Sequence, residues 1–371
     1  MKSLDMVLNG FELSMQGPEK KERLKISGEY PLNALSRFLF SQLGLMHLIA
    51  PYFPKEIKTN FDVNKKVQSL IGAMYESERH NQPCFRAEGN IFNLDIPFKN
   101  LSSNAERVAV AYSAGKDSMW NLWWAQEKYG AENVLVVHVS GLNKGVGSRE
   151  AEYVRKQQQE FGFPYLKIIN LLNGSKNSGH KVMRSRDIFL AGIIIPSALE
   201  FGASKIITEG FEDVDETELF SGKEENMACF NKILDEIGIP VQVAWRNQGE
   251  MECVKDLFLH RPGWMPHVSN CFAPPCYLVS LRRNWQKKFP GFPLYDSQCG
   301  FCIKCRIINL GRILWDSAIR DVKTEDVIAY LKDTAGWINA NRARLIDMIE
   351  GSFLNTFKKA CEKYEFEAPI K

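Results

Sequence analysis

The sequence lacks an apolar run long enough to cross a bilayer. Its longest run, from Ile188 to Leu199, lies between Asp187 and Glu200 and falls well short of the roughly 20 residues that a membrane-spanning helix needs. It therefore predicts a buried helix. The first residues, MKSLDMVLNGFELSMQ, contain no continuous apolar stretch followed by a small-residue cleavage site, which is the pattern of a signal peptide. We therefore expect a cytoplasmic protein without a membrane partner.

An excess of charge of one sign is also missing. The chain has 47 Lys and Arg against 44 Asp and Glu, a net charge of +3, which argues against a protein that coats nucleic acid. One local basic run, Arg282 to Lys288, is typical of a solvated helix face, so we expect no nucleic-acid partner. The composition, 45% apolar and 25% charged over 371 residues, is that of a globular protein with room for two or three domains.

The nine cysteines are odd in number and concentrated in the C-terminal half, which in a reducing compartment favours metal binding or buried thiols over disulfides. The segment CGFCIKC places Cys299, Cys302 and Cys305 at two successive C-x-x-C spacings. Tetrahedral zinc needs a fourth thiolate, for which we favour Cys271, with Cys276 as the alternative. We expect a closed, structural Zn²⁺ site; an iron–sulfur cluster is the competing interpretation.

The pattern of predicted strands and helices changes twice along the sequence. Residues 1–104 mix strand-like and helix-like pieces and predict an N-terminal α+β domain that binds a partner. From Arg107 onward, short β-branched runs alternate with helical segments, which predicts an α/β fold with an open, mostly parallel sheet. We assign this domain to residues 105–310, including a zinc-binding segment at 271–305. A C-terminal helical region follows at residues 311–371.

The stretch VAVAYSAGKDSMW, residues 108–120, is similar to part of a Walker phosphate-binding loop. That loop requires a glycine where this chain has Ala109, and Ser or Thr where it has Asp117. The Walker interpretation therefore fails. What remains is a turn, residues 113–118, between a predicted strand and a predicted helix.

This 113–118 turn has the chemistry of an anion site. Its small residues let backbone N–H groups approach an anion, and the start of the following helix adds partial positive charge. Ser113 and Ser118 offer hydroxyls, Lys116 offers a cation, and Asp117 can help to hold Mg²⁺. The alternative is that Asp117 is simply a helix N-cap and Gly115 only permits a tight turn.

The turn resembles the Ser-Gly-Gly-x-Asp-Ser signature of the PP-loop ATP pyrophosphatases. The resemblance implies that Ser113, Ala114, Gly115, Lys116, Asp117 and Ser118 bind ATP, with Lys116 and Asp117 as catalytic residues. ATP would then be cleaved to AMP and pyrophosphate. One departure is Ala114, which replaces the first glycine of the signature; we expect its φ to be negative, because a methyl group is disfavoured at positive φ.

Together with CGFCIKC, the turn resembles the 7-cyano-7-deazaguanine synthase (QueC) family over residues 107–310. The segment SRDIFLAGIII matches the start of a helix in that family, which implies that Arg186 contacts ATP. KIITEGFEDVDETELFSGKEE is similar to its substrate loop, which implies that Phe220, Ser221 and Glu225 contact the deazaguanine. The implied cofactors are ATP, Mg²⁺ and Zn²⁺, and the implied substrate is 7-carboxy-7-deazaguanine.

Several departures from the family bear on the reaction. Asn247 to Glu250 replace an Asp-Lys-x-Glu segment, Asn226-Met227 replace Cys-Arg, the segment between Cys271 and the cysteine knuckle is longer, and the family lacks the N-terminal residues. QueC-like proteins of antiphage defence operons join the deazaguanine carboxylate to a protein amine, and an added domain suits such a macromolecular acceptor. We therefore expect an AMP-forming carbon–nitrogen ligase that makes an amide with a protein from its own operon.

Other interpretations stay open. One is a synthase that uses ammonia and continues to the nitrile. Others are a PP-loop enzyme that modifies tRNA and an inactive nucleotide-binding scaffold. A homodimer is an open alternative to a monomer.

Overall fold

The computed structural model describes residues 3–17, 20–28, 30–92, 101–141, 147–173, 180–209, 224–246, 248–269, 271, 273 and 275–370. The strands are β1 (Ser3–Asn9), β2 (Glu12–Gly17), β3 (Lys20–Gly28), β4 (Glu56–Phe61), β5 (Cys84–Phe92), β6 (Asn104–Ala111), β7 (Val134–Ser140), β8 (Tyr165–Asn173), β9 (Ala203–Glu209) and β10 (Gln242–Arg246). The helices are α1 (Ala34–Ile49), α2 (Lys65–Ser77), α3 (Lys116–Tyr129), α4 (Gly147–Phe161), α5 (His180–Phe201), α6 (Glu224–Glu236), α7 (Glu250–His260), α8 (Pro275–Lys288), α9 (Ile303–Trp315), α10 (Thr324–Asn341), α11 (Ile346–Ile349) and α12 (Ser352–Lys363). Short 3-10 helices cover Ala131–Asn133, Pro262–His267 and Ser317–Asp321.

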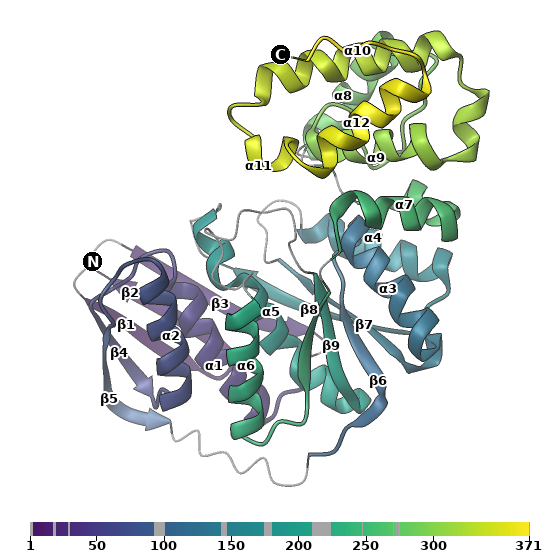
Figure 1. The fold of residues 1–371 in the computed structure, drawn as a ribbon. Coiled ribbons are helices and arrows are strands. Elements are labelled where there is room, and N and C mark those ends of the chain that lie inside the picture. Colours follow the sequence, from purple (N-terminus) through teal and green to yellow (C-terminus); the bar gives the residue numbers. More distant parts are fainter. Residues whose placement is uncertain are drawn as a thin grey trace.

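The ten strands of the described residues form one sheet, in the order β10-β9-β6-β7-β8-β3-β2-β1-β4-β5 (Figure 1). The five strands from β10 to β8 are parallel to one another. The predicted α/β class with a mostly parallel sheet is therefore confirmed. Within this half, β7 and β8 lie on one side of β6, and β9 and β10 lie on the other. The strand order reverses between β6 and β9, and in open α/β sheets this is where ligands bind.

The parallel strands are buried on both faces, and their side chains alternate between two cores. On β6, Ala109 belongs to one core and Val108 and Val110 to the other. Helices α1, α2, α5 and α6 supply the first core, and α3, α4, α7 and the C-terminal helices supply the second. The apolar run Ile188–Leu199 lies in α5, so the predicted buried helix is confirmed.

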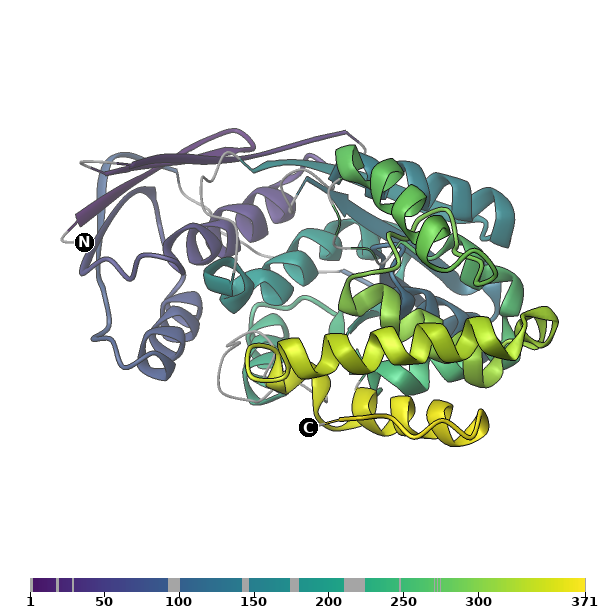
Figure 2. The same ribbon diagram turned by 90° about the horizontal axis from the view of Figure 1, so that it is seen from above.

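The N-terminal region extends the same sheet. Strand β3 pairs antiparallel with β8, so the sheet is continuous across the predicted domain boundary at residue 104. Helix α1 packs on α5, and both contribute to one core. Figure 2 shows these elements, in purple, at one end of the sheet, away from the C-terminal helices.

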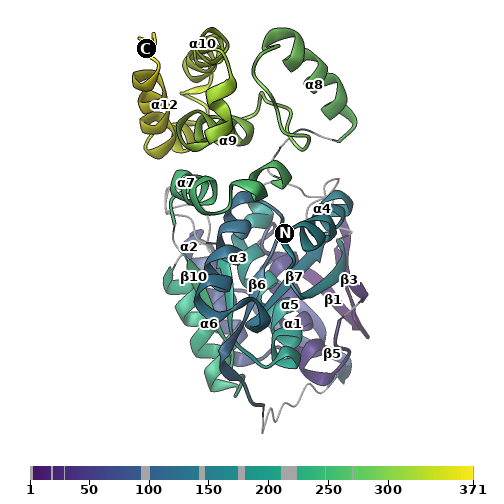
Figure 3. The ribbon, with the colours of Figure 1, turned by 90° about the vertical axis from the view of Figure 1, so that its right-hand side faces the viewer.

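The helices from α8 to α12 gather at one end of the molecule, with α7 between them and the sheet (Figures 1 and 3). They contain the cysteine-rich segment, and the predicted boundary at residue 310 falls inside α9. Helix α9 contacts both α7 and α12. Among the described residues, no helix combines the length and apolar composition that crossing a membrane requires.

The close approach of α7 and α9 depends on Gly311. A methyl group at Gly311 would lie 2.3 Å from Cγ1 of Val254 and 3.0 Å from Cε2 of Phe258, both on α7. We expect Gly311→Ala to lower the free energy of unfolding by about 1–2 kcal/mol, because overpacking costs more than the gain in helix propensity. Gly336→Ala on α10 is the matched control: its methyl group meets nothing within 4 Å, so it should stabilise by about 1 kcal/mol. Urea unfolding measures both, and a stabilising Gly311→Ala would contradict this packing.

Candidate functional site

The 113–118 turn follows the carboxyl end of β6, at the point where the strand order reverses. Ala114 within it has φ of +64°, so the expected negative φ is wrong. This left-handed conformation costs a residue with a Cβ about 1–2 kcal/mol. The Ala114 carbonyl accepts hydrogen bonds from the backbone N–H of Ser269 (2.9 Å) and from Nε2 of Gln157 (3.3 Å). These two bonds hold the strained conformation in place.

Helix α3 begins at Lys116, within the 113–118 turn, with Gly115 as its N-cap. Glycine has no side chain to cap the first N–H groups of the helix, so this end of α3 suits an anion. Ser118 Oγ lies 3.2 Å from Ser113 Oγ and donates to the carbonyl of Gly115 at 3.0 Å. Asp117 stands in the first turn of the helix instead of at the cap. The alternative interpretation of Asp117 as an N-cap is therefore wrong.

Lys116 is buried, with 1% of its side chain exposed. Its Nζ lies 2.6 Å from Oδ1 of Asp117 and 2.7 Å from Oε1 of Glu250. Burial disfavours the ammonium charge, but the two carboxylates outweigh it and raise the pKa of Lys116. The turn therefore contains a permanently charged cation held by two carboxylates.

Glu250 begins α7 and joins two lysines. Its Oε1 accepts from Lys116 and also from Nζ of Lys304, near the start of α9. Burial by itself would raise the pKa of Glu250, but the two lysines reverse this effect and lower it to about 2. Glu250 is therefore ionised throughout the physiological range.

Arg186 and Glu209 also lie near the turn. Glu209 ends β9 and accepts a hydrogen bond from Ser113 Oγ at 3.4 Å. Arg186 Nε pairs with Oδ1 of Asp187 at 2.8 Å. Burial and then the charge of Asp117 raise the pKa of Glu209 to about 7, against the attraction of Arg186. Carboxylates that repel one another in this way are suitable ligands for Mg²⁺.

The structure says little about the three residues predicted to contact the substrate, Phe220, Ser221 and Glu225. Phe220 and Ser221 lie outside the described residues. Glu225 is exposed in the first turn of α6, and its role stays a prediction. The structure therefore brings together the turn and Arg186, but it does not test the deazaguanine contacts.

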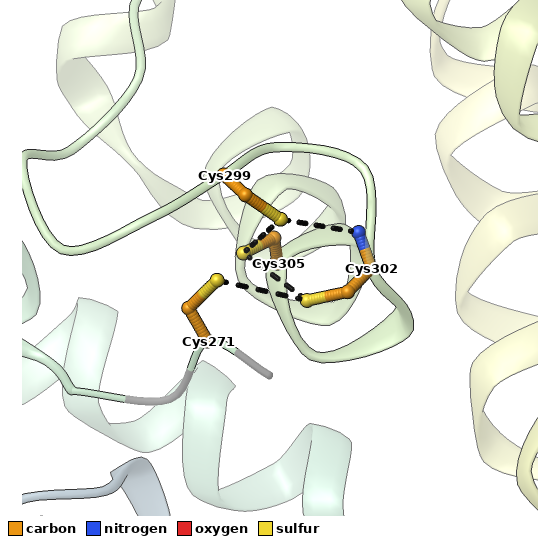
Figure 4. A group of neighbouring side chains, drawn as sticks. All are labelled: Cys271, Cys299, Cys302 and Cys305. Carbon is orange, nitrogen blue, oxygen red and sulfur yellow. Dashed lines mark hydrogen bonds between the residues drawn. The ribbon is translucent and has the colours of Figure 1, made fainter. Parts of the chain in front are cut away.

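Four cysteines converge at the start of α9 (Figure 4). The Sγ atoms of Cys271, Cys299, Cys302 and Cys305, hereafter the cysteine cluster, all lie within 4.8 Å of one another. Three of the separations are 3.5, 3.9 and 4.0 Å. A zinc ion with Zn–S bonds of about 2.3 Å needs sulfurs about 3.8 Å apart. The cluster could therefore hold one such ion, with Cys271 as the fourth residue; Cys276 is exposed on α8, outside the cluster.

The surroundings of the cluster also fit a metal. Backbone N–H groups of Ala273 and Cys302 approach the sulfurs of Cys271 and Cys299 at 3.3 and 3.5 Å, and such donors stabilise thiolates. The sulfurs are too far apart for disulfides, whose bond is about 2.0 Å. Thiolates that bind separate irons of a cluster stand farther apart than these, so the spacing favours a single ion.

Sequence reasoning missed four contributors to the site: Glu209, Glu250, Lys304 and the buried Gln157. Glu209 had a usable signal, because it stands at the carboxyl end of a predicted parallel strand. Lys304 and Gln157 had none, since each acts across a long sequence separation: Gln157 bonds to the carbonyl of Ala114, and Lys304 pairs with Glu250. No protein-family model matches the chain, and no curated protein matches it in sequence. The interpretation of the site therefore depends on its geometry and motifs.

The raised pKa of Glu209 predicts that the free energy of unfolding depends on pH. Between its ordinary value of 4.5 and about 7, folded Glu209 keeps a proton that the unfolded chain has lost, so stability falls as pH rises through this window. Glu209→Gln removes the ionisable group. We expect the stability of this variant relative to the wild type to increase by about 3 kcal/mol from pH 4.5 to pH 8. Urea unfolding across this range measures the difference, and a constant difference would contradict the assignment.

The cysteine cluster predicts a structural metal. Cys302→Ala should reduce bound zinc well below one ion per chain and lower the melting temperature, because metal binding contributes folding free energy. Cys276→Ala is the matched control and should change neither. Elemental analysis of the purified variants and thermal unfolding provide the readouts; full zinc occupancy in Cys302→Ala would show that the cluster is not the site.

Proposed function

We propose that this protein is an AMP-forming carbon–nitrogen ligase, in which the 113–118 turn binds the phosphates of ATP. The observation that carries the proposal is the position of this turn. It joins a central parallel strand to an uncapped helix N-terminus where the strand order reverses, with the buried ammonium of Lys116 beside it. Helix N-termini and fixed cations stabilise phosphate charge.

The proposed first step is activation of a carboxylate. A carboxylate oxygen attacks the α-phosphorus of ATP, the bond between the α-phosphorus and its bridging oxygen breaks, and pyrophosphate leaves. In this proposal, Ser113, Lys116 and the N–H groups of α3 stabilise the charge that develops on the departing pyrophosphate. A magnesium ion held by Asp117, with Glu209 nearby, would add charge neutralisation.

The second step forms the amide. An amine nitrogen attacks the acyl carbon of the adenylate, the bond to AMP breaks, and the amine loses a proton. We propose 7-carboxy-7-deazaguanine as the acid and a protein amine from the same operon as the acceptor. The support for these two assignments is the motif resemblance around Arg186 and residues 205–225, together with the added N-terminal region.

Asp117 provides the direct test of the first step. We expect Asp117→Asn to lower the rate of pyrophosphate release with ATP and 7-carboxy-7-deazaguanine by at least about 100-fold, because the charged ligand next to the transferred phosphate is lost. Asp5→Asn, at an exposed position of β1 in the other half of the sheet, should retain the wild-type rate.

The outcomes separate the alternatives. Pyrophosphate release that depends on carboxy-deazaguanine supports the ligase, and no release with any acid supports a scaffold. Intact-mass analysis of co-expressed operon proteins then identifies the acceptor: a deazaguanine adduct supports the protein amine. Free nitrile formed from ammonia, with unmodified partners, would replace this proposal with nitrile synthesis.

A further inference from the structure

We infer that metal binding at the cysteine cluster is energetically coupled to nucleotide binding at the 113–118 turn, with Lys304 as the positioning residue that links them. The inference rests on the proposed nucleotide site and concerns its control. Two separate chains of contacts join the cluster to the turn, and each begins at a segment that carries cluster cysteines.

The first chain runs through α9. Cys302 is the N-cap of this helix, and Lys304 stands between Cys302 and Cys305. Nζ of Lys304 pairs with Oε1 of Glu250, and the same oxygen accepts from Lys116 of the turn at 2.7 Å. The carboxylate of Glu250 therefore connects Lys304, which lies next to the cluster cysteines, to Lys116 of the turn. Lys304 is flanked by Cys302 and Cys305 of the cluster. A metal that fixes the positions of these cysteines therefore also fixes the backbone position of Lys304.

The second chain runs through the segment before Cys271. The N–H of Ser269 donates to the carbonyl of Ala114 at 2.9 Å, and Ser269 lies two residues before Cys271. The preceding residue, Val268, accepts a hydrogen bond from Oγ of Ser297, which lies two residues before Cys299. The segment before Cys271 is thus hydrogen-bonded both to the segment before Cys299 and to Ala114, the strained residue of the turn.

The charges of Lys116, Lys304 and Glu250 indicate that Lys304 favours nucleotide binding. Lys116 and Lys304 balance Asp117 and Glu250, so the four buried or half-buried groups are neutral as a set. A bound triphosphate attracts Lys116 away from Glu250. Lys304 then continues to neutralise Glu250, whose carboxylate is poorly solvated and gains from a neighbouring cation. Without Lys304, Glu250 retains Lys116 and competes with the phosphates for it.

Variants of the lysine and its carboxylate test this direction. We expect Lys304→Met to weaken the binding of MgATP about tenfold, measured by calorimetry, and Lys304→Arg to bind nearly as the wild type does. The double variant Lys304→Met with Glu250→Gln should recover most of the loss, because the competing carboxylate is gone. Lys287→Met, an exposed lysine on α8, is the matched control and should bind as the wild type does.

A merely structural role of Lys304 gives a different pattern. It would lower the melting temperature of Lys304→Met and leave the double variant as weak as the single one, which would overturn the inference. Thermal unfolding of each variant accompanies the calorimetry for this reason.

Linkage supplies the closing experiment, since coupling between two sites is reciprocal. The zinc affinity of the wild type is measured by equilibrium competition with a coloured chelator, with and without saturating MgATP in excess magnesium. We expect MgATP to tighten zinc binding several-fold in the wild type and to have little effect in Lys304→Met. Equal zinc affinities in a wild type that binds MgATP would overturn the coupling alone. A wild type that binds no MgATP would overturn the proposed function, and this inference with it.

Discussion

One carboxylate oxygen, Oε1 of Glu250, accepts from the ammonium groups of both Lys116 and Lys304, and the rest of the site is arranged around it. An ammonium as buried as that of Lys116 is costly to keep charged unless carboxylates surround it. This requirement places the first turn of α7 against the first turn of α3. It also places α9 against α7, where Gly311 permits the close contact. The C-terminal helices thereby become part of the proposed nucleotide site.

The backbone conformation of the turn also depends on residues far away in the sequence. Ala114 holds a conformation that its own methyl group disfavours, and its carbonyl is fixed by Ser269 and Gln157. Strain of this kind persists only where the surroundings over-determine it, and it is concentrated at functional sites. The turn is therefore shaped by contacts from beyond its own sequence.

The N-terminal region is also structurally bound to the site. His47 of α1 stacks on Phe189 of α5, with ring centroids 4.5 Å apart, and its Nδ1 lies 3.1 Å from Oγ of Ser185. Burial and the nearby charge of Arg186 lower the pKa of His47 to about 3, so it is neutral at physiological pH. Helix α1 thus supports the part of α5 that carries Arg186. Any partner that this region binds must approach surfaces other than this contact.

The sequence by itself determined the α/β class, the parallel strands and the turn between β6 and α3, because hydrophobic periodicity and small residues are local properties. It also identified three of the four cluster cysteines by their spacing. Only the tertiary structure decided that Cys271 completes the cluster, that β3 continues the sheet, that Ala114 is left-handed, and that Glu250 lies between Lys116 and Lys304. These features depend on contacts between residues far apart in the chain, and neither periodicity nor spacing records such contacts.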